Sequence, residues 1–180
     1  MERKKKKLLI VIDMQNDFID GALANPAAQA IVDPIAEKIK SWEGDVWFTR
    51  DTHDCDYINT QEGKFLPVPH CIAFTEGWHI HKKLIASVKP LSIRIIDKHS
   101  FGEKNWKGYM DIYGNDRYDE IYLCGTCTDI CVVSNALILK ATFPEIPIKC
   151  YANLCAGVTP EKHAAALEVM RSCQVEVLDE

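Results

Sequence analysis

The sequence predicts an α/β fold: a single domain with a mostly parallel six-stranded sheet that helices cover on both faces. Short apolar segments typical of buried strands alternate along the chain with longer segments of helical periodicity. The chain has 180 residues, 47% of them hydrophobic, and contains no linker, internal repeat or low-complexity segment. That length is enough for one substantial core, so we treat residues 1–180 as one domain.

Six segments have the composition of strands. The first is a continuous apolar run that ends at Asp13, and the others are equally short and largely apolar. Continuous apolar strands are typical of a parallel sheet covered on both faces, in which the crossovers are right-handed. The six segments are Leu8–Asp13, Asp45–Arg50, Ser92–Asp97, Glu120–Cys124, Pro147–Tyr151 and Gln174–Leu178.

Four segments between these strands have helical signals. Asn25 and Pro26 are typical of an N-cap and a first helical residue, so a helix is predicted from there to about Trp42, with a kink or a restart at Asp33-Pro34. The other predicted helices are His79–Val88, Thr128–Thr142 and Pro160–Ser172. We interpret Gly114–Asp119 as a polar turn.

The last two predicted helices carry apolar residues at helical spacing. The helix over 128–142 is apolar on more than one face, so we expect it to be well buried. The helix over 160–172 carries a single stripe that should face the core. The apolar residues are Ile130, Val133, Leu137, Ile138 and Ala141 in the first helix, and Ala166, Val169, Met170 and Cys173 in the second.

Charge, hydropathy and cysteine usage limit the partners and the compartment. The net charge is −5, and we interpret the one basic cluster, Lys4–Lys7, as a solvated lead-in, so no nucleic acid partner is indicated. The apolar run Leu8–Ile12 is too short for a signal peptide, and no other stretch could span a bilayer. We therefore expect a cytoplasmic protein without a membrane partner. Its eight cysteines should be reduced thiols, several of them in the core; they are Cys55, Cys71, Cys124, Cys127, Cys131, Cys150, Cys155 and Cys173.

Three reactive residues are predicted to meet at one edge of the sheet. Asp13 closes the first strand, Lys98 follows the third, and Cys131 lies in the first turn of the helix after the fourth. Ligands of open α/β sheets bind at the carboxyl ends of the strands, which is where these residues fall. Taken singly, they would be a turn former, a surface lysine and a buried filler. Only their joint placement favours a site.

The chemistry of this trio is that of a cysteine nucleophile. A helix N-terminus and a nearby ammonium both lower the pKa of a thiol, and a carboxylate can take its proton. The same carboxylate can later protonate a leaving amine. Backbone N–H groups of the turn Gly125–Thr128 and of Cys131 are candidates for an oxyanion hole. The trio therefore predicts hydrolysis of a small amide.

A second cluster has metal-ligand chemistry. Asp51 and His53 stand at i and i+2 of an extended segment, so their side chains point the same way, and Glu62 and His70 follow. Two histidines with two carboxylates suit Zn²⁺, or Mn²⁺ or Fe²⁺ with added waters. Segments rich in aspartate and histidine are also commonly just solvated, so both interpretations remain open here.

Three motifs resemble those of the isochorismatase-like cysteine hydrolases, a superfamily that includes nicotinamidases. They are Val11–Phe18 (VIDMQNDF), Ile96–Phe101 (IDKHSF) and Gly125–Val132 (GTCTDICV), in family order over nearly the whole chain. The resemblance implies that Asp13 shuttles the proton, that Lys98 holds the thiolate and the aspartate in place, and that Cys131 forms a thioester. It also implies a cis peptide at Thr126-Cys127, with the amides of Cys127 and Cys131 as the oxyanion hole.

The resemblance extends to the metal ligands of nicotinamidases. Those enzymes carry an Asp-x-His motif and a later histidine after proline, as in Asp51-Thr52-His53 and Pro69-His70. Glu62 is then the candidate for the remaining protein ligand, and the metal binds the pyridine nitrogen. The chain departs from the pattern at Leu66 and Pro67, near which many nicotinamidases have a tryptophan, and at Phe74, which replaces a glycine.

These observations lead to a preferred function and to alternatives. The preferred function is conversion of nicotinamide and water to nicotinate and ammonia, with Phe18 and Leu66 contacting the substrate and Phe74 as a further candidate aromatic contact. A related hydrolase acting on another small amide or an N-carbamoyl compound is the nearest alternative. A thiol-redox or metal-binding protein without turnover, based on the Cys124-x-x-Cys127 spacing, is the other. Isochorismate hydrolysis fits less well, because it needs neither this metal set nor a thiol.

The resemblance also suggests a homo-oligomer. His79 and His81 are expected on the surface of their helix.

Overall fold

The computed structural model describes residues 5–89, 93–113 and 118–179 and contains a six-stranded sheet in which all strands are parallel. The strand order is β3-β2-β1-β4-β5-β6, so the α/β fold predicted from the sequence is confirmed. The strands are β1 (Lys7–Ile12), β2 (Asp45–Asp51), β3 (Ile93–Lys98), β4 (Glu120–Thr126), β5 (Ile148–Ala156) and β6 (Glu176–Leu178).

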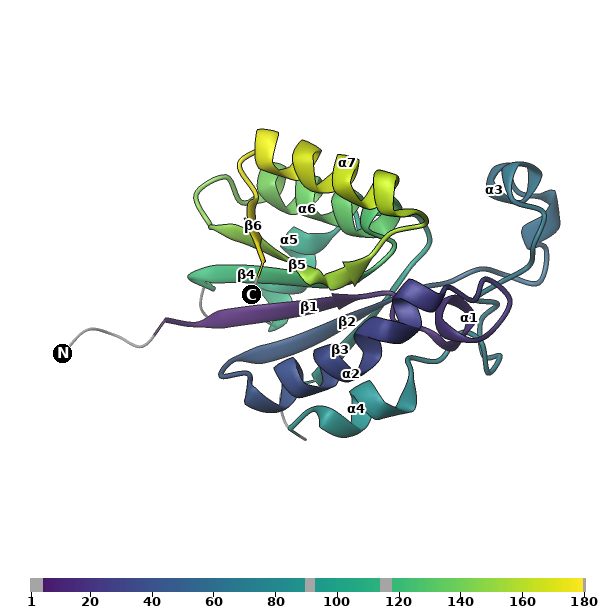
Figure 1. Cartoon of the computed structure of the whole chain (residues 1–180), viewed down its shortest axis with the longest axis horizontal. Helices are drawn as coiled ribbons and strands as arrows, with labels where there is room; N and C mark the ends of the chain where they lie inside the picture. Colours follow the sequence, from purple (N-terminus) through teal and green to yellow (C-terminus); the bar gives the residue numbers. More distant parts are fainter. Residues whose placement is uncertain (1–4, 90–92, 114–117, 180) are drawn as a thin grey trace.

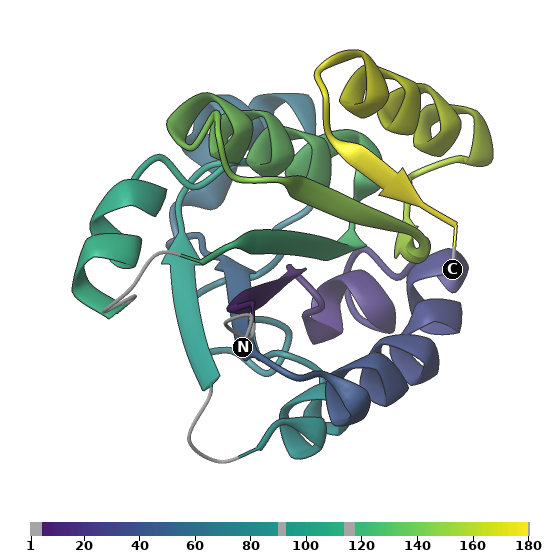
Figure 2. The same cartoon turned by 90° about the vertical axis from the view of Figure 1, so that its left-hand side faces the viewer.

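Helices cover both faces of the sheet (Figures 1 and 2). On one face lie α2 (Pro26–Ser41) and α4 (Lys82–Ser87), and on the other α5 (Trp106–Tyr113), α6 (Val133–Thr142) and α7 (Pro160–Ser172). Two short helices, α1 (Asn16–Ile19) and α3 (Gln61–Phe65), lie beyond the carboxyl ends of the strands, at the right in Figure 1. No helix in the described ranges is long and apolar enough to cross a membrane.

Strand β1 forms the centre of the core. It pairs with β2 on one side and β4 on the other, and each residue from Leu8 to Ile12 is 0% exposed. Burial on both faces explains why this segment is apolar without alternation. A strand held on both sides also fixes the position of the residue that follows it, Asp13.

The first long helix begins as predicted. Asn25 is the N-cap, its side chain accepts a hydrogen bond from the amide of Ala27, and Pro26 is the first helical residue. The helix continues through Pro34 to Ser41 without the restart that the sequence left open. Burial of one face, including Ile35, outweighs the single hydrogen bond that proline removes.

The prediction of a helix over His79–Val88 was wrong at its start. Helix α4 begins at Lys82, with His81 as its N-cap. Ile80 forms an antiparallel bridge with Gln15, and the amide of His81 donates to the carbonyl of Met14, which keeps this segment extended. His79 is exposed and His81 half-buried, but neither lies within the helix.

The segment 128–142 consists of two parts rather than one helix. A π-helical turn, η2 (Thr128–Val132), precedes α6. The predicted apolar stripe is not the buried face: Leu137 and Ile138 are half-buried, whereas Leu139 is 0% exposed. Because a π turn is wider than an α-helical turn, α6 buries a different set of residues from the set that continuous helical periodicity predicts.

Other boundaries differ from prediction by a few residues. In α7, Val169 is 47% exposed and Cys173 is also exposed, while Leu167 packs in the core. Lys98 is the last residue of β3 rather than following it. Strands β4 and β5 run longer than predicted and β6 is shorter, while the short helices α1, α3 and α5 and the 3-10 turn η1 (Tyr57–Asn59) had no sequence prediction. Lys4, Ser92 and most of the turn predicted at 114–119 lie outside the described residues.

The assignment of the buried face of α6 can be tested by comparing two leucines. Leu139→Ala should lower the free energy of unfolding by about 2–5 kcal/mol, because it opens a cavity in the core. Leu137→Ala on the half-buried face should cost clearly less. Chemical denaturation of both variants measures the difference, and a larger loss at Leu137 would contradict the described buried face.

Candidate active site

Asp13, Lys98 and Cys131 meet in the interior at the carboxyl edge of the sheet. Their exposed fractions are 0%, 1% and 5%. The Nζ atom of Lys98 lies 2.7 Å from Oδ2 of Asp13 and 3.5 Å from Sγ of Cys131. Each is delivered by a different element: Asp13 by the turn after β1, Lys98 by the end of β3 and Cys131 by η2 after β4.

Thr49 on β2 fixes the aspartate. Its hydroxyl donates to Oδ1 of Asp13 at 2.6 Å and accepts the backbone N–H of Asp13 at 3.2 Å. These two bonds hold the carboxylate with Oδ2 toward Lys98. No motif in the sequence indicated Thr49, and the only signal was a polar residue directly after the apolar run Val46–Phe48.

Burial governs the protonation of the trio. Burial and the Asp13 carboxylate raise the pKa of the Cys131 thiol well above its usual range, and Lys98 offsets this only in part. Burial also raises the pKa of Asp13. Burial alone would lower the pKa of Lys98, but Asp13, Cys131 and Asp51 raise it well above its usual value. The sequence predicted a lowered thiol pKa, whereas the surroundings of Cys131 shift it in the opposite direction.

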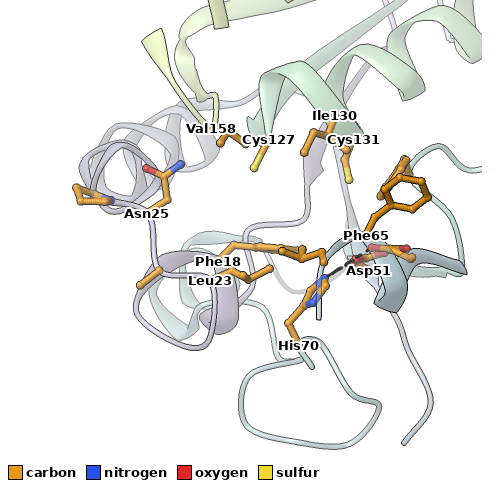
Figure 3. Close-up of a pocket in the computed structure, with 15 residues that line it drawn as sticks. Phe18, Leu23, Asn25, Asp51, Phe65, His70, Cys127, Ile130, Cys131 and Val158 are labelled. Atoms are coloured by element: carbon orange, nitrogen blue, oxygen red, sulfur yellow. Dashed lines mark ion pairs between the residues drawn. The ribbon is translucent and has the colours of Figure 1, made fainter. Parts of the chain in front are cut away.

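A pocket of about 490 Å³ opens onto this edge (Figure 3). Figure 3 shows Cys127 and Cys131 on one side and Phe18 and His70 on the opposite side. Leu66 lines the pocket as expected, together with two phenylalanines that the sequence did not single out, Phe65 and Phe101. The pocket lining consists of Phe18, Leu23, Ala24, Asn25, Pro26, Asp51, Glu62, Phe65, Leu66, His70, Phe101, Cys127, Ile130, Cys131 and Val158.

Phe74 is not among the pocket residues, so its suggested substrate contact was wrong. Its side chain is 86% exposed and packs against Trp78 instead. It also adopts a left-handed backbone conformation with a φ of 67°. That conformation suits glycine, which accounts for the glycine of the family pattern at this position.

Four potential metal ligands gather at the floor of the pocket, which three of them, Asp51, Glu62 and His70, line directly. One ligand atom from each of Asp51, His53, Glu62 and His70 lies within 4.8 Å of the others. Nε2 of His53 is 3.0 Å from Oδ2 of Asp51 and 3.7 Å from Oε1 of Glu62. Nδ1 of His70 lies 2.8 Å from the carbonyl of Val68, which assigns its proton to Nδ1 and leaves Nε2 as the ligand atom.

The electrostatics of these four residues also suit a cation. Burial opposes ionisation of Asp51, yet the neighbouring His53 and His70 side chains and the charge of Lys98 hold its pKa well below the usual range. Burial and the neighbouring Asp51 raise the pKa of Glu62. Burial alone would lower the pKa of His70, but Asp51 raises it. A divalent ion would replace the protons that this cluster now attracts, and two imidazoles with two carboxylates fit Zn²⁺.

The aromatic residues around the cluster were only partly predicted. Tyr57 packs against the rings of His53 and His70, with centroid distances of 4.7 and 5.0 Å, and its hydroxyl donates to the carbonyl of Leu66. Phe18 contacts His70 edge to face at 5.6 Å. Tyr57 thereby links a pocket residue to both histidines, a role that no motif in the sequence indicated.

The family follows from comparison with known proteins. Residues 7–180 match the model of the isochorismatase domain. The chain belongs to the isochorismatase family. The nicotinamidase/pyrazinamidase of Mycobacterium tuberculosis is 28% identical over 192 residues, which cover 96% of this chain and 98% of that protein.

Two solved structures share the isochorismatase-family fold over its full extent. That of nicotinamidase/pyrazinamidase from Bacillus subtilis has a TM-score of 0.83 and 28% identity, covering 97% of this chain and 100% of the other. That of pyrazinamidase from Pyrococcus horikoshii in complex with zinc has a TM-score of 0.79 and 26% identity, covering 97% and 99%.

The predicted site residues of this isochorismatase-family chain therefore lie together in space. The trio, the four potential ligands, Phe18 and Leu66 all border one another or the pocket, and the peptide bond between Thr126 and Cys127 is cis. Their chemical roles stay predictions. The chain thus has a candidate nucleophile and a candidate metal site facing one cavity.

The buried ion pair should dominate local stability. Lys98→Met would leave two buried carboxylates without their cation and should lower the free energy of unfolding by about 3–5 kcal/mol. Adding Asp13→Asn should restore part of that loss. The surface pair control, Lys107→Met, should change little. Urea denaturation checks this, and equal losses for the Lys98 and Lys107 variants would refute it.

Proposed function

We propose that this chain is a cysteine amidohydrolase that converts nicotinamide and water to nicotinate and ammonia. One observation carries the proposal: Cys131, which contacts Lys98 of the buried trio, lines the same pocket as Asp51, Glu62 and His70 of the four-residue metal-type cluster. The trio supplies amide hydrolysis, and the cluster favours a substrate with a metal-binding ring atom. Relatives named nicotinamidase and pyrazinamidase support the same assignment.

The first step is attack by sulfur. Oδ2 of Asp13 takes the Cys131 proton while Sγ bonds to the amide carbon and the carbonyl π electrons move to oxygen. Because the pKa of Cys131 is raised, this transfer accompanies attack instead of preceding it. Lys98 stays protonated and stabilises the charges on Asp13 and on sulfur.

The intermediate then collapses to a thioester. The oxyanion is placed against the backbone amides of Cys127 and Cys131. As the carbon–nitrogen bond breaks, Asp13 returns its proton to nitrogen, and ammonia leaves. Asp13 next takes a proton from water while the water oxygen attacks the thioester carbon. The carbon–sulfur bond then breaks as Asp13 returns this proton to sulfur, which releases the acid and restores the Cys131 thiol. A raised Asp13 pKa suits both directions of transfer.

The metal is proposed to orient the ring. Asp51, His53, Glu62 and His70 would hold Zn²⁺, with Mn²⁺ or Fe²⁺ as alternatives, and a bound ion would supply a Lewis acid for the pyridine nitrogen. Phe18 and Leu66 would pack against the ring within the pocket. Ring binding at the floor would then direct the carboxamide toward Cys131.

A related amide is the second candidate substrate. The resemblance places a tryptophan near Leu66 and Pro67, where this chain has none, and Phe65, which lines the pocket, is 82% exposed, so the wall differs from a closed ring site. A panel of nicotinamide, pyrazinamide, aliphatic amides and N-carbamoyl compounds decides between them by kcat/KM. Cytoplasmic location and assembly into a homo-oligomer stay predictions.

The thiol-redox alternative fits the structure poorly. Redox-active cysteines have lowered pKa values and solvent access. Cys124 is 0% exposed, and burial raises the pKa of both Cys124 and Cys127. Neither thiol has the environment of a redox pair.

Removing the nucleophile should abolish turnover. Cys131→Ala should reduce ammonia release from nicotinamide by at least about a thousandfold, because no other group can form the thioester. Cys173→Ala, which removes an exposed thiol at the end of α7, should leave the rate unchanged. A coupled ammonia assay measures both variants. Activity retained by Cys131→Ala would exclude the proposed mechanism.

The loss of activity that follows metal removal should be reversible. Treatment with a chelator should lower kcat/KM for nicotinamide at least tenfold, mainly through KM, because the ring loses its anchor. Added Zn²⁺ should restore it, whereas His53→Ala should not respond. Elemental analysis of the purified protein gives the occupancy. Protein that carries no metal and does not hydrolyse nicotinamide would rule out the proposed function.

A further inference from the structure

Gln15 occupies the turn between β1 and α1 and is completely buried. Its side-chain amide makes three hydrogen bonds. Oε1 accepts the backbone N–H of Asp51 at 2.7 Å, and Nε2 donates to the backbone carbonyls of Asp51 and Trp78, each at 2.9 Å. One side chain therefore satisfies both backbone polar groups of Asp51.

These hydrogen bonds lie where β2 no longer has β1 as a paired neighbour. β2 pairs with β1 only as far as Val11 and Phe48, because the chain turns away at Asp13, where φ is 48°. On its other side β2 stays paired with β3 as far as Asp51 and Lys98. The amide of Gln15 thus takes the position that the next residues of β1 would have occupied beside Asp51.

The backbone position of Asp51 matters because its carboxylate contacts both the reactive trio and the candidate metal cluster. Its carboxylate lies 3.1 Å from Nζ of Lys98 through Oδ1, and 3.0 Å from His53 and 3.7 Å from His70 through Oδ2. It therefore joins the candidate metal cluster to the reactive trio. A small shift of its backbone would move both oxygen atoms and change all of these distances at once.

The hydrogen bond from Gln15 to the carbonyl of Trp78 links a third segment of the chain to β2 and to the turn after β1. The indole N–H of Trp78 donates to the hydroxyl of Thr52, next to Asp51, at 2.9 Å. The chain between His70 and Trp78 is further held where the amide of Cys71 donates to Asp17 at 2.7 Å. Gln15 thus fastens the end of β2 to the segment that carries His70.

We propose that Gln15 is a positioning residue that holds Asp51 in the geometry required for metal binding. This inference rests on the metal site of the proposed function. Outer groups that orient metal ligands change metal affinity by about 10- to 100-fold when they are removed. The same range is expected here, although Gln15 itself does not contact the metal.

The test measures Zn²⁺ affinity without any substrate, by competition with a chromophoric chelator on the full chain. Gln15→Met keeps the side-chain volume and removes all three hydrogen bonds, so affinity should fall about 10- to 100-fold. Asn135→Leu is the matched control: this equally buried amide bonds to Phe101, Glu103, Trp106 and Cys131, none of which is a potential metal ligand. It should lose stability but keep its Zn²⁺ affinity within about threefold.

Unchanged affinity in Gln15→Met, or an equal loss in Asn135→Leu, would overturn the inference. If circular dichroism shows that Gln15→Met does not fold, Gln15→Asn replaces it. That amide is one methylene too short to span both groups of Asp51, so at least a threefold loss is expected, and wild-type affinity would overturn the inference. Wild-type protein that binds Zn²⁺ but does not hydrolyse nicotinamide would refute the proposed function and leave the role of Gln15 standing.

Discussion

The ammonium group of Lys98 is the charge around which the site is arranged. It is buried in the interior, where an isolated charge is very costly, and the Asp13 and Asp51 carboxylates surround it. The ion pair with Asp13 keeps a base beside the Cys131 thiol, and the one with Asp51 keeps a carboxylate beside two histidines. Changing any one of these charges therefore alters the protonation of the rest.

Asp51 connects two kinds of chemistry that would otherwise be independent. One oxygen faces Lys98 and the other faces His53 and His70. The pocket lies between these groups, with Cys131 on one wall and the four-residue cluster at the floor. A substrate that binds the floor through a ring atom would present a second group to the thiol, and the spacing between the two sites then becomes a determinant of specificity.

Burial explains both the reactivity and the selectivity proposed for this site. In the proposed mechanism, the raised pKa of the Cys131 thiol means that its proton leaves as the sulfur attacks the carbonyl. The exposed apolar side chains at the mouth, such as Phe65 and Phe101, contrast with the charged floor. That contrast favours a ligand with an apolar face and one polar end.

Most of the site was predictable because its residues lie at strand ends or in short motifs. Asp13 follows β1 and Lys98 ends β3, and parallel strands bring their carboxyl ends to one edge. Thr49 and Tyr57 gave no comparable signal, and the motif that contains Gln15 does not reveal which residues its side chain contacts. Each acts through a hydrogen bond or a ring contact with a residue far along the chain, and sequence spacing does not encode such a contact.

The sequence by itself determined the alternation of strands and helices, the family motifs and the identity of the reactive groups, because these depend on local composition and spacing. Only the tertiary structure decided the direction in which the pKa of Cys131 shifts, the face of α6 that is buried after the π turn, and the exclusion of Phe74 from the pocket. The physical reason is common to all three. Desolvation, helix rotation and side-chain direction depend on which distant segments pack around a residue, and the chain acquires those neighbours only when it folds.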